Sequence, residues 1–398
     1  MNGVKYTEAV EKFVLGAAFS GLRFGFLWSM GLGGADSEAR GFGKSALMQH
    51  LAWSLNEDFG QSAYLSCGLD ESDAAEAPIC GLLTSFDTTQ IRSLAAALFT
   101  AVEYAVDFKT EDDVPTLAVR LRNRLAAIAG SDEPSELVNL VLAEQRKLRG
   151  RTLGPPDEKL VRALCADEPS LAIDYLDQVK PATRTRSGAN FLSTFLLFAS
   201  AAGMKHVLLC CDQLEDLAST TTAKSKRDLE TERFRDVILE TLPMADMLAV
   251  VVTMHPRAAL VIGSAWQLAD LPSFEPNELA NRHRVVVLEV LKSVAEATGL
   301  LRTYLDAARK PDSERSSGDL HPMTQDAVDA MFARSNRKPR DILRKAHGIF
   351  EYAAGENVEV IDGHIVAQYL DALGPDEDDA DDRPSLAGPT GAPDWSSG

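Results

Sequence analysis

Short, almost unbroken apolar runs alternate with long helical patterns in this chain of 398 residues. The clearest run is His206 to Cys211 (HVLLCC), and similar runs occupy Met247 to Thr253 and Arg284 to Leu288. An alternating run at Leu22 to Met30 and a short one at Ala63 to Cys67 predict two further strands. Strands that are apolar on both faces and separated by helices are typical of a parallel sheet covered on both sides. We therefore expect an α/β fold.

Helical periodicity fills most of the remaining chain up to residue 373, including the whole stretch from residue 67 to about residue 176. Leu47, Leu51 and Leu55 recur every four residues, which predicts a helix with one buried face. The other expected helices, separated by Gly, Pro and Asp clusters, are Tyr6 to Phe19, Ile91 to Phe108, Val114 to Ala129, Ser135 to Leu148, Asp157 to Cys165, Val290 to Ala308, Thr324 to Ala333, Arg340 to Ala354 and Gly363 to Leu373.

Acidic residues outnumber basic ones by 59 to 40, which gives a formal net charge of −19. This charge disfavours bulk electrostatic binding of nucleic acid, so such a contact would need a partner or a local basic patch such as Thr183 to Arg186. Five cysteines without a CxxC pair favour a reduced compartment. We see no secretory signal, and the long apolar stretches are interrupted by Arg23 or by Lys205 and His206. We therefore expect a cytoplasmic protein that does not enter a membrane.

The segment RGFGKS lies between an expected strand and the amphipathic helix. In such a loop, small residues let backbone N–H groups point at phosphate oxygens, and the helix adds the positive end of its dipole. Lys44 would neutralise the β- and γ-phosphates, and the Ser45 hydroxyl would bind Mg²⁺. Glu38 occupies the first glycine position of the GxxxxGK[ST] pattern, and a chance GKS at a helix start is the alternative. The residues expected to contact nucleotide are Arg40, Gly41, Phe42, Gly43, Lys44, Ser45 and Ala46.

Asp212 follows directly on the apolar run HVLLCC. A carboxylate at such a strand end, near a phosphate loop, can hold Mg²⁺ through its waters; capping of the strand end is the alternative role. Gln213 stands where a carboxylate often polarises the attacking water, and an amide does not accept a proton as Glu does. Either Glu215 or Asp216 would then reach that water, or hydrolysis is slow.

Taken together, these motifs resemble those of the AAA+ ATPases, in particular the origin-recognition-type branch and the related STAND switch ATPases. RGFGKSAL resembles the P-loop, and LLCCDQLEDL resembles the Walker B strand. VVVTMHP resembles the strand that ends in sensor 1, and SNRKPRDILRKA resembles the start of the lid helix. The resemblance covers roughly residues 10 to 373. It implies a P-loop NTPase sheet flanked by helices, with ATP and Mg²⁺ as cofactors.

The resemblance also implies roles for two residues outside the loop. Thr253 would be the sensor 1 residue near the γ-phosphate, and Arg340 would be the sensor 2 residue that reaches from the lid to bound ATP. A β-branched strand end and a surface Arg at a helix start are the alternatives. No basic residue ends the stretch RFRDVILETLPMAD, where the family's trans-acting Arg finger would lie. Only an acidic tail follows Leu373, so we do not expect a winged helix, which weakens a DNA-binding role.

The expected organisation is a nucleotide-binding core over residues 1–275, with a helical insertion at 74–178 that offers a surface to protein partners. Residues 276–373 would hold the fifth strand and a helical lid, and residues 374–398 a disordered acidic tail. The expected function is a slow or partner-activated ATPase that switches the assembly of a homo-oligomer or multi-protein complex. Bacterial DNA transactions and anti-phage systems are the settings that the resemblance suggests. A hydrolysis-poor nucleotide-binding scaffold is the alternative, and a P-loop kinase is less favoured.

Overall fold

The chain packs as two compact units. The sheet unit contains Lys5–Trp28 and Lys44–Val287, and the helical unit contains Met1–Val4, Ser29–Gly43 and Leu288–Gly398. The computed structural model describes residues 3–29, 41–85, 93–109, 114–147, 155–214, 224–236, 247–254, 263–309 and 319–373. The chain passes from one unit to the other at four places, one of which lies between Gly43 and Lys44.

Strands and helices alternate along the sheet unit, and helices follow the last strand in the helical unit. The strands are β1 Phe24–Ser29, β2 Ile79–Ser85, β3 His206–Asp212, β4 Leu248–Met254 and β5 Val285–Leu288. The helical elements up to β5 are α1 Gly3–Ala9, the π-helical η1 Val10–Leu15, α2 Gly16–Phe19, α3 Lys44–Asp58, α4 Gln61–Ser66, α5 Glu71–Glu76, α6 Leu94–Asp107, α7 Leu117–Ala129, α8 Pro134–Lys147, α9 Glu158–Leu164, α10 Ser170–Asp177, α11 Pro181–Ala201, α12 Lys224–Arg235 and the 3₁₀ turn η6 Leu279–Asn281. The later helices are α14 Val294–Ala308, α15 Gln325–Ala333, α16 Pro339–Gly355 and α17 Gly363–Leu373.

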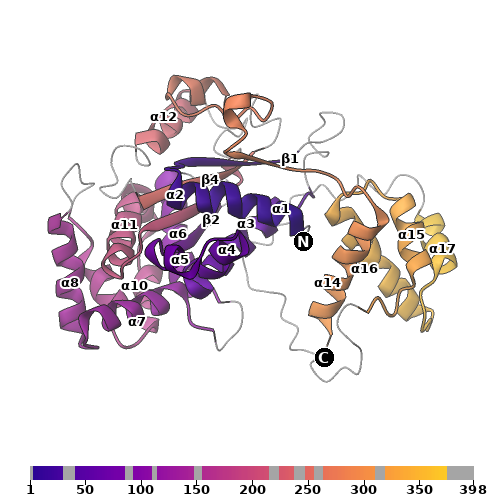
Figure 1. Cartoon of the computed structure of the whole chain (residues 1–398), viewed down its shortest axis with the longest axis horizontal. Coiled ribbons are helices and arrows are strands. Elements are labelled where there is room, and N and C mark those ends of the chain that lie inside the picture. Colours follow the sequence, from indigo (N-terminus) through magenta and orange to yellow (C-terminus); the bar gives the residue numbers. More distant parts are fainter. Residues whose placement is uncertain are drawn as a thin grey trace. The chain divides into compact units, whose positions relative to one another are not determined.

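The five strands form one parallel sheet in the order β2-β3-β4-β1-β5, flanked by helices (Figure 1). The expected α/β class is therefore confirmed. The chain leaves β1 toward the β2 edge, whereas it leaves the neighbouring β4 toward β5 on the other side. In open parallel sheets, ligands bind at the carboxyl ends of the strands where this reversal occurs. The topology thus points to the carboxyl ends of β1 and β4.

Alternate side chains of β1 face opposite sides of the sheet. On one side, Phe26 packs against Trp266 and Phe274, with ring centroids 6.1 and 6.0 Å away. This side shares one buried cluster with α6 and α11. On the other side, a Cβ atom added to Gly25 would lie 2.6 Å from the Phe13 ring of η1, so only glycine leaves room for that ring. Both faces of this strand are thus buried, as its apolar sequence requires.

Helix α3 packs against β2, which is the first strand in the sheet order. A Cβ atom on Gly81 would lie 2.5 Å from the Cα atom of Ala52, so the helix approaches closely. The Asn56 side chain donates to the Gly81 carbonyl at 2.9 Å and accepts from the Gly81 N–H at 2.8 Å. The Ile79 N–H donates to the Phe59 carbonyl at 3.0 Å. These bonds satisfy main-chain groups on the outer side of an edge strand.

The second strand is not where the sequence predicts it. The expected strand at Ala63 to Cys67 is wrong, because α4 covers most of this stretch. Ala63 and Tyr64 are both buried, the Tyr64 hydroxyl donates to the Ala77 carbonyl at 2.7 Å, and Leu65 is exposed. Apolar positions therefore do not alternate here, and five residues are too few to separate the two periods. The true strand, β2, lies inside the region expected to be wholly helical, so that expectation is corrected as well.

The other four strands are confirmed, and so are the helices predicted from their periodicity. The first of these helices is built from α1, η1 and α2. All five cysteines are free thiols. Among the described residues, no helix combines the length and apolarity needed to cross a membrane. The acidic tail at 374–398 lies outside the described residues.

The helical unit is built around a core shared by α14 to α17. Pro339 occupies the first helical position of α16, because its fixed φ suits a helix start and it lacks an N–H that would remain unpaired. Ile342, Ala346 and Ile349 form the buried face of that helix. Leu343 and Phe350 of the same helix are half-buried.

Candidate functional site

Polar side chains from three neighbouring strands lie at the carboxyl edge of the sheet. Ser85 ends β2 and lies opposite Asp212, which ends β3. Cys211 lies opposite Val252 of β4, so Asp212 comes level with Thr253 in the same register. Carboxyl ends of parallel strands are where such sheets bind ligands. The fold thus gathers a carboxylate and two hydroxyl groups where the topology points.

Hydrogen bonds join these strand ends into one network. The Thr253 hydroxyl donates to Asp212 Oδ1 at 3.1 Å and accepts from the Gln213 N–H at 2.9 Å. That N–H also lies 3.0 Å from Asp212 Oδ1. The Ser85 hydroxyl donates to Gln213 Oε1 at 2.8 Å. In the described part of the chain, both hydrogen bonds to Asp212 end on Oδ1, and Oδ2 takes part in neither.

The backbone at Gln213 adopts a left-handed conformation, with φ of 56°. This region is sparsely populated by residues other than glycine, and it costs of order 1 kcal/mol or more. The turn brings the Gln213 N–H back onto the Asp212 and Thr253 side chains. Thr253 is fully buried, Asp212 is half-buried and Gln213 is exposed. The strand end is therefore held by its own polar groups and opens toward solvent at Gln213.

The interior of β3 beneath Asp212 is apolar and closed to water. Burial raises the pKa of the Cys210 thiol to about 12, and the Asp212 charge acts in the same direction. Burial likewise raises the pKa of the Cys211 thiol. Both thiols are neutral at physiological pH, so they pack as small apolar groups and do not act as nucleophiles.

Helix α3 brings its amino end to the same edge of the sheet. The middle of α3 packs closely against β2, because Ala52 contacts Gly81. Lys44 lies about 12 Å before Ala52 along the helix axis, and Ser85 lies about 13 Å beyond Gly81 along the strand. Since helix and strand run in opposite directions, Lys44 comes level with Ser85, which lies opposite Asp212. Within the sheet unit, Lys44 and the expected Mg²⁺ carboxylate Asp212 thus lie at one edge.

The glycines ahead of α3 make the turn into the helix. Gly41 and Gly43 both have φ of 84°, a left-handed conformation that glycine adopts without strain. Lys44 is half-buried, whereas Ser45 and Ala46 are exposed. The first N–H groups of a helix have no partner within it, so they remain for a ligand or for water. Arg40 and Glu38, which precede this turn, lie outside the described residues.

Within the helical unit, the loop segment contacts the amino end of α16. The Gly41 carbonyl accepts from the Arg340 N–H at 3.0 Å, and a Cβ atom on Gly41 would lie 3.1 Å from that of Arg340. The Lys338 ammonium lies 5.8 Å from the centroid of the buried Phe42 ring, within reach of a cation–π contact. The Arg340 side chain is exposed and bonds to none of the described residues. The predicted sensor 2 residue therefore adjoins the predicted phosphate loop.

No protein-family model matches this chain, and no curated protein matches it. Its function is therefore inferred from the fold and from the geometry of this edge.

The expected site is brought together in part. Asp212, Gln213 and Thr253 are joined by hydrogen bonds, whereas Glu215 and its alternative Asp216 lie outside the described residues. Ser85 is not among the expected site residues, because its strand lies in a stretch that the sequence pattern predicts to be helical. The polar pair that ends the run ICGLLTS was the available signal.

The basic patch at Thr183 to Arg186 forms the first turns of α11. Arg184 pairs with Glu103 at 2.7 Å, and its guanidinium lies 4.6 Å from the centroid of the Phe99 ring. It also donates to the Leu176 carbonyl at 3.1 Å. These contacts commit Arg184 to packing α11 on α6, which leaves it a poor ligand for nucleic-acid phosphate.

The described residues contain no group of three or more His, Cys, Asp or Glu side chains that could hold a metal ion by themselves. Mg²⁺ usually keeps several waters and takes one or two protein oxygens together with substrate phosphates. Asp212 and Ser45 supply oxygens of that kind on the two sides of the edge. The donor set thus fits Mg²⁺ that arrives with a nucleotide.

Proposed function

We propose that this chain is an ATP-binding P-loop ATPase of the AAA+ and STAND-like kind, in which bound nucleotide switches assembly or partner binding. One observation carries the proposal: the Lys44 helix starts level with the networked carboxylate Asp212, at the carboxyl edge of a parallel sheet where the topology reverses. A cationic helix start that faces a carboxylate is the arrangement that Mg·nucleotide needs.

Each group has a definite task in this proposal. Lys44 and the first N–H groups of α3 bind the β- and γ-phosphates. Ser45 and Asp212 Oδ2 hold Mg²⁺, while Thr253 fixes the carboxylate by bonding to Oδ1. Bound ATP would supply the γ-phosphoryl group for transfer to water. Arg340, in contact with the loop at Gly41, reports on the phosphates.

The amide at Gln213 supports a second candidate, a nucleotide-binding scaffold that hydrolyses ATP poorly. Its Oε1 atom already accepts from Ser85, and an amide does not take a proton from water. Slow turnover in the isolated chain, with Asp212 still required for Mg²⁺ binding, is the behaviour that this geometry favours.

The glycine loop offers a route for the switch. Gly41 to Gly43 pack with the helical unit, whereas Lys44 begins a helix of the sheet unit. The proposed phosphate loop therefore contains the chain link from one unit to the other, at Gly43 and Lys44. In this proposal α14 to α17 form the lid.

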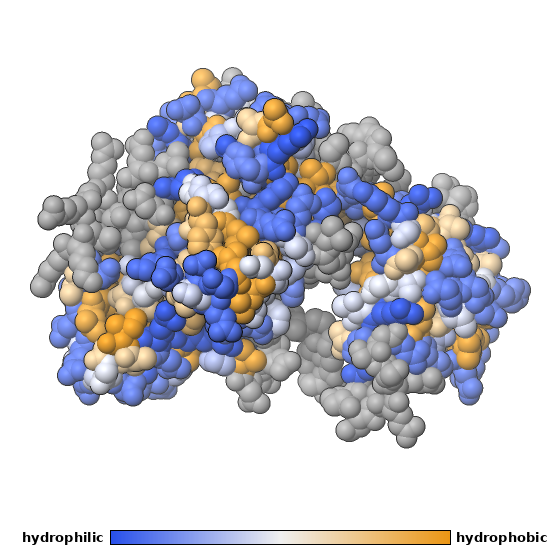
Figure 2. Space-filling model, in the orientation of Figure 1, coloured by the Kyte–Doolittle hydropathy of each residue, from blue (hydrophilic) through white to orange (hydrophobic). Residues whose placement is uncertain are grey.

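The helices between β2 and β3, α6 to α11, are the proposed insertion and partner surface. Ile128, Leu140 and Leu171 are large apolar residues of α7, α8 and α10 that stay 57%, 39% and 44% exposed. A further hydrophobic area lies over α4 (Figure 2), where Leu65 is 40% exposed. Such surfaces suit a homo-oligomer or a multi-protein complex in the cytoplasm.

Replacing Asp212 by Asn should abolish the dependence of ATP binding on Mg²⁺, because the amide loses the charge that holds the cation. Calorimetric titration of the full chain with ATP, with and without Mg²⁺, measures this. We expect Mg²⁺ to tighten ATP binding about tenfold or more in the wild type and to have almost no effect in the variant. Asp174→Asn, an exposed residue of α10, is the matched control. An unchanged Mg²⁺ effect in Asp212→Asn would contradict the metal assignment.

Replacing Arg340 by Ala should leave Mg·ATP affinity within about threefold and remove the nucleotide-dependent change in assembly. An exposed side chain that reads the phosphates adds little binding energy of its own. Sedimentation velocity with and without Mg·ATP measures the assembly state. Arg302→Ala, an exposed position on α14, is the control. If Arg340→Ala still responds like the wild type, or if the wild type shows no response, the switch proposal is wrong.

A further inference from the structure

A cavity of about 480 Å³ lies at the amino ends of β1 and β5. Arg23 and Arg284, which directly precede these two strands, both line it, and so does Lys12 of η1. This is the sheet edge opposite Asp212, and β1 alone separates the two edges by about 20 Å. The cavity is therefore distinct from the candidate nucleotide site.

The lining carries an excess of positive charge. Two guanidinium groups and one ammonium group face one carboxylate, Glu11, and the exposed His283 is also present. Glu8 pairs with Lys12, so at most one positive charge of the lining stays in excess, in a chain whose net charge is −19. A concave site lined by one sign of charge focuses its field on a ligand of the opposite sign.

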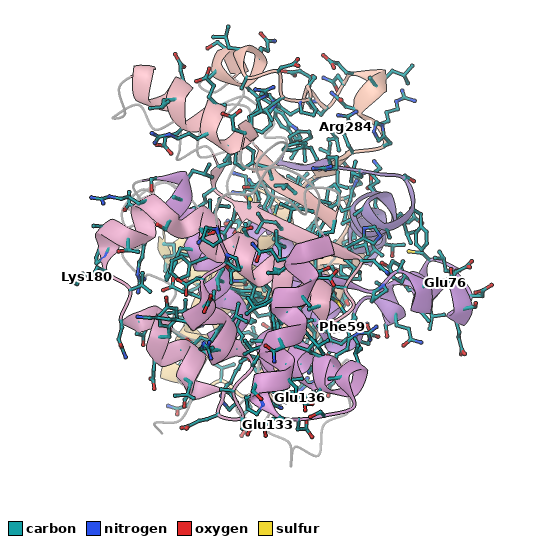
Figure 3. The ribbon with its side chains drawn as sticks, turned by 90° about the vertical axis from the view of Figure 1, so that its left-hand side faces the viewer. Phe59, Glu76, Glu133, Glu136, Lys180 and Arg284 are labelled. Carbon is teal, nitrogen blue, oxygen red and sulfur yellow. The ribbon has the colours of Figure 1, made fainter. Side chains whose placement is uncertain are left out.

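Backbone hydrogen bonds hold Arg284 in place, but its guanidinium group has one N–H donor without a partner in the described part of the chain. Its N–H donates to the Asn281 carbonyl at 2.9 Å, and its carbonyl accepts from the Phe26 N–H at 2.8 Å. The Nε atom is buried, and among the described residues it has no hydrogen-bond partner (the residue is labelled in Figure 3). A buried donor of a charged group that lacks a partner is costly. Because this atom is occluded, an anion in the cavity would offset the cost through its charge beside the guanidinium and not by bonding to Nε.

Lys12 is fixed beside the same cavity. Its ammonium group donates to Glu8 Oε1 and to the Val285 carbonyl, both at 2.8 Å. An ammonium group has three N–H donors, so one remains for a ligand. The bond to the Val285 carbonyl of β5 holds the Lys12 ammonium group in place beside the cavity.

Apolar residues complete the lining. Leu15, Leu22, Phe24 and Pro272 provide hydrocarbon surface next to the cations. At Gly21, a Cβ atom would meet nothing within 4 Å, so the wall there is open. A cavity of this volume accommodates a small organic molecule rather than a bare ion.

We propose that this cavity binds a small organic phosphate monoester, with the phosphate on Arg284, Arg23 and Lys12 and the organic part against the apolar wall. A phosphate monoester carries a charge between −1.5 and −2 at neutral pH, so the cations of the lining attract it more strongly than a singly charged anion. Guanidinium forks bind tetrahedral oxyanions through paired N–H bonds. The inference is independent of the proposed nucleotide site.

The test uses the full chain and phenyl phosphate as the probe, measured by calorimetry and by ³¹P line broadening. The Lys44→Ala background removes the candidate phosphate loop from the measurement. We expect phenyl phosphate to bind this background, and Arg284→Gln to weaken binding about tenfold to a hundredfold. Arg282→Gln is the matched control, because Arg282 is exposed and does not line the cavity. Arg284→Lys, which keeps the charge and loses the fork, should be intermediate and guards against misfolding of the Gln variant.

Phenyl sulfate and phthalate separate the possible anions. We expect weaker binding of phenyl sulfate, because its single charge is attracted less strongly by the cations of the lining. Three results would overturn the proposal: no binding of phenyl phosphate at millimolar concentration, equal binding by the Arg284→Gln and Arg282→Gln variants, or tighter binding of phthalate than of phenyl phosphate. The last result would assign the cavity to dicarboxylates.

Discussion

Replacing Lys44 by alanine should weaken Mg·ATP binding about tenfold to a hundredfold, the value of a charge-assisted contact to phosphate that no other residue replaces. Lys44 opens α3, whose axis is fixed by the Ala52 contact and the Asn56 bonds to β2. The helix will therefore stay in place when the side chain is removed. Calorimetric titration of wild type and variant with Mg·ATP measures the loss, with phosphate release followed in the same samples.

Gln49→Ala is the matched control, because Gln49 is an exposed residue of the same helix, more than one turn further on. It should bind Mg·ATP like the wild type. Loss of both binding and turnover in Lys44→Ala, with binding and turnover intact in the wild type, would support an ATPase. Binding without turnover in the wild type would support the scaffold and make Gln213→Glu the next variant. Equal affinity of Lys44→Ala and wild type would reject the site.

Replacing Gly188 by alanine should destabilise the sheet unit by about 3 kcal/mol. Gly188 lies where α11 crosses α6, and a Cβ atom there would be 1.6 Å from the Ala95 carbonyl oxygen. The obstacle is helix backbone and not the end of a flexible side chain, so the two helices must move apart. That movement opens the cluster that covers one face of the sheet. Thermal unfolding followed by circular dichroism should show a loss of roughly 5–10 °C.

The same substitution at Gly299 is the control for this effect. Gly299 lies in α14, is exposed, and an added Cβ atom would meet nothing within 4 Å. Alanine there should stabilise its helix by about 0.5–1 kcal/mol through its better helix propensity. If Gly188→Ala unfolds at the wild-type temperature, the close crossing of α6 and α11 is wrong.

Most of the sheet could be predicted from residue pattern, because central parallel strands must be apolar on both faces. Apart from His206 and Thr253 at their ends, HVLLCC and MLAVVVT have no polar residue to place in solvent, so they admit few other structures. The helices of the helical unit could be predicted in the same way, since Ile342, Ala346 and Ile349, for example, repeat at helical spacing. These signals are local, and local pattern is sufficient for them.

The strand β2 could not be predicted from an apolar run of this kind. ICGLLTS is short, contains Gly81 and carries polar residues at its carboxyl end, so it resembles part of a helix as much as a strand. Its place in the sheet depends on Ala52 and Asn56 of α3, which lie about 25 residues earlier in the sequence. Because β2 was not predicted, the contribution of Ser85 to the site was not predicted either. No periodicity encodes such a tertiary contact.

The features of the candidate site also fall into those that a local pattern indicates and those that depend on tertiary contacts. Asp212 and Thr253 could be singled out from the sequence because Asp212 ends β3 and Thr253 is next to last in β4, both strands with a clear apolar pattern. The contact between Gly41 and Arg340 joins two segments about 300 residues apart and depends on backbone geometry at both ends. The left-handed backbone at Gln213 likewise leaves no trace in residue type. The roles of Lys44 and Ser45 in binding stay predictions.

The strand order also determines when the sheet can be completed during synthesis. β1 emerges first from the ribosome, yet both of its neighbours, β4 and β5, come last, and Phe24 must wait for Val250. At roughly 5–20 residues per second, that wait is on the order of ten to forty seconds. Throughout it, Phe26 and Trp28 lack the strands and aromatic partners that later bury them. The nascent chain is thus a substrate for chaperones until β4 arrives, and truncation before residue 250 should yield aggregates rather than a smaller folded domain.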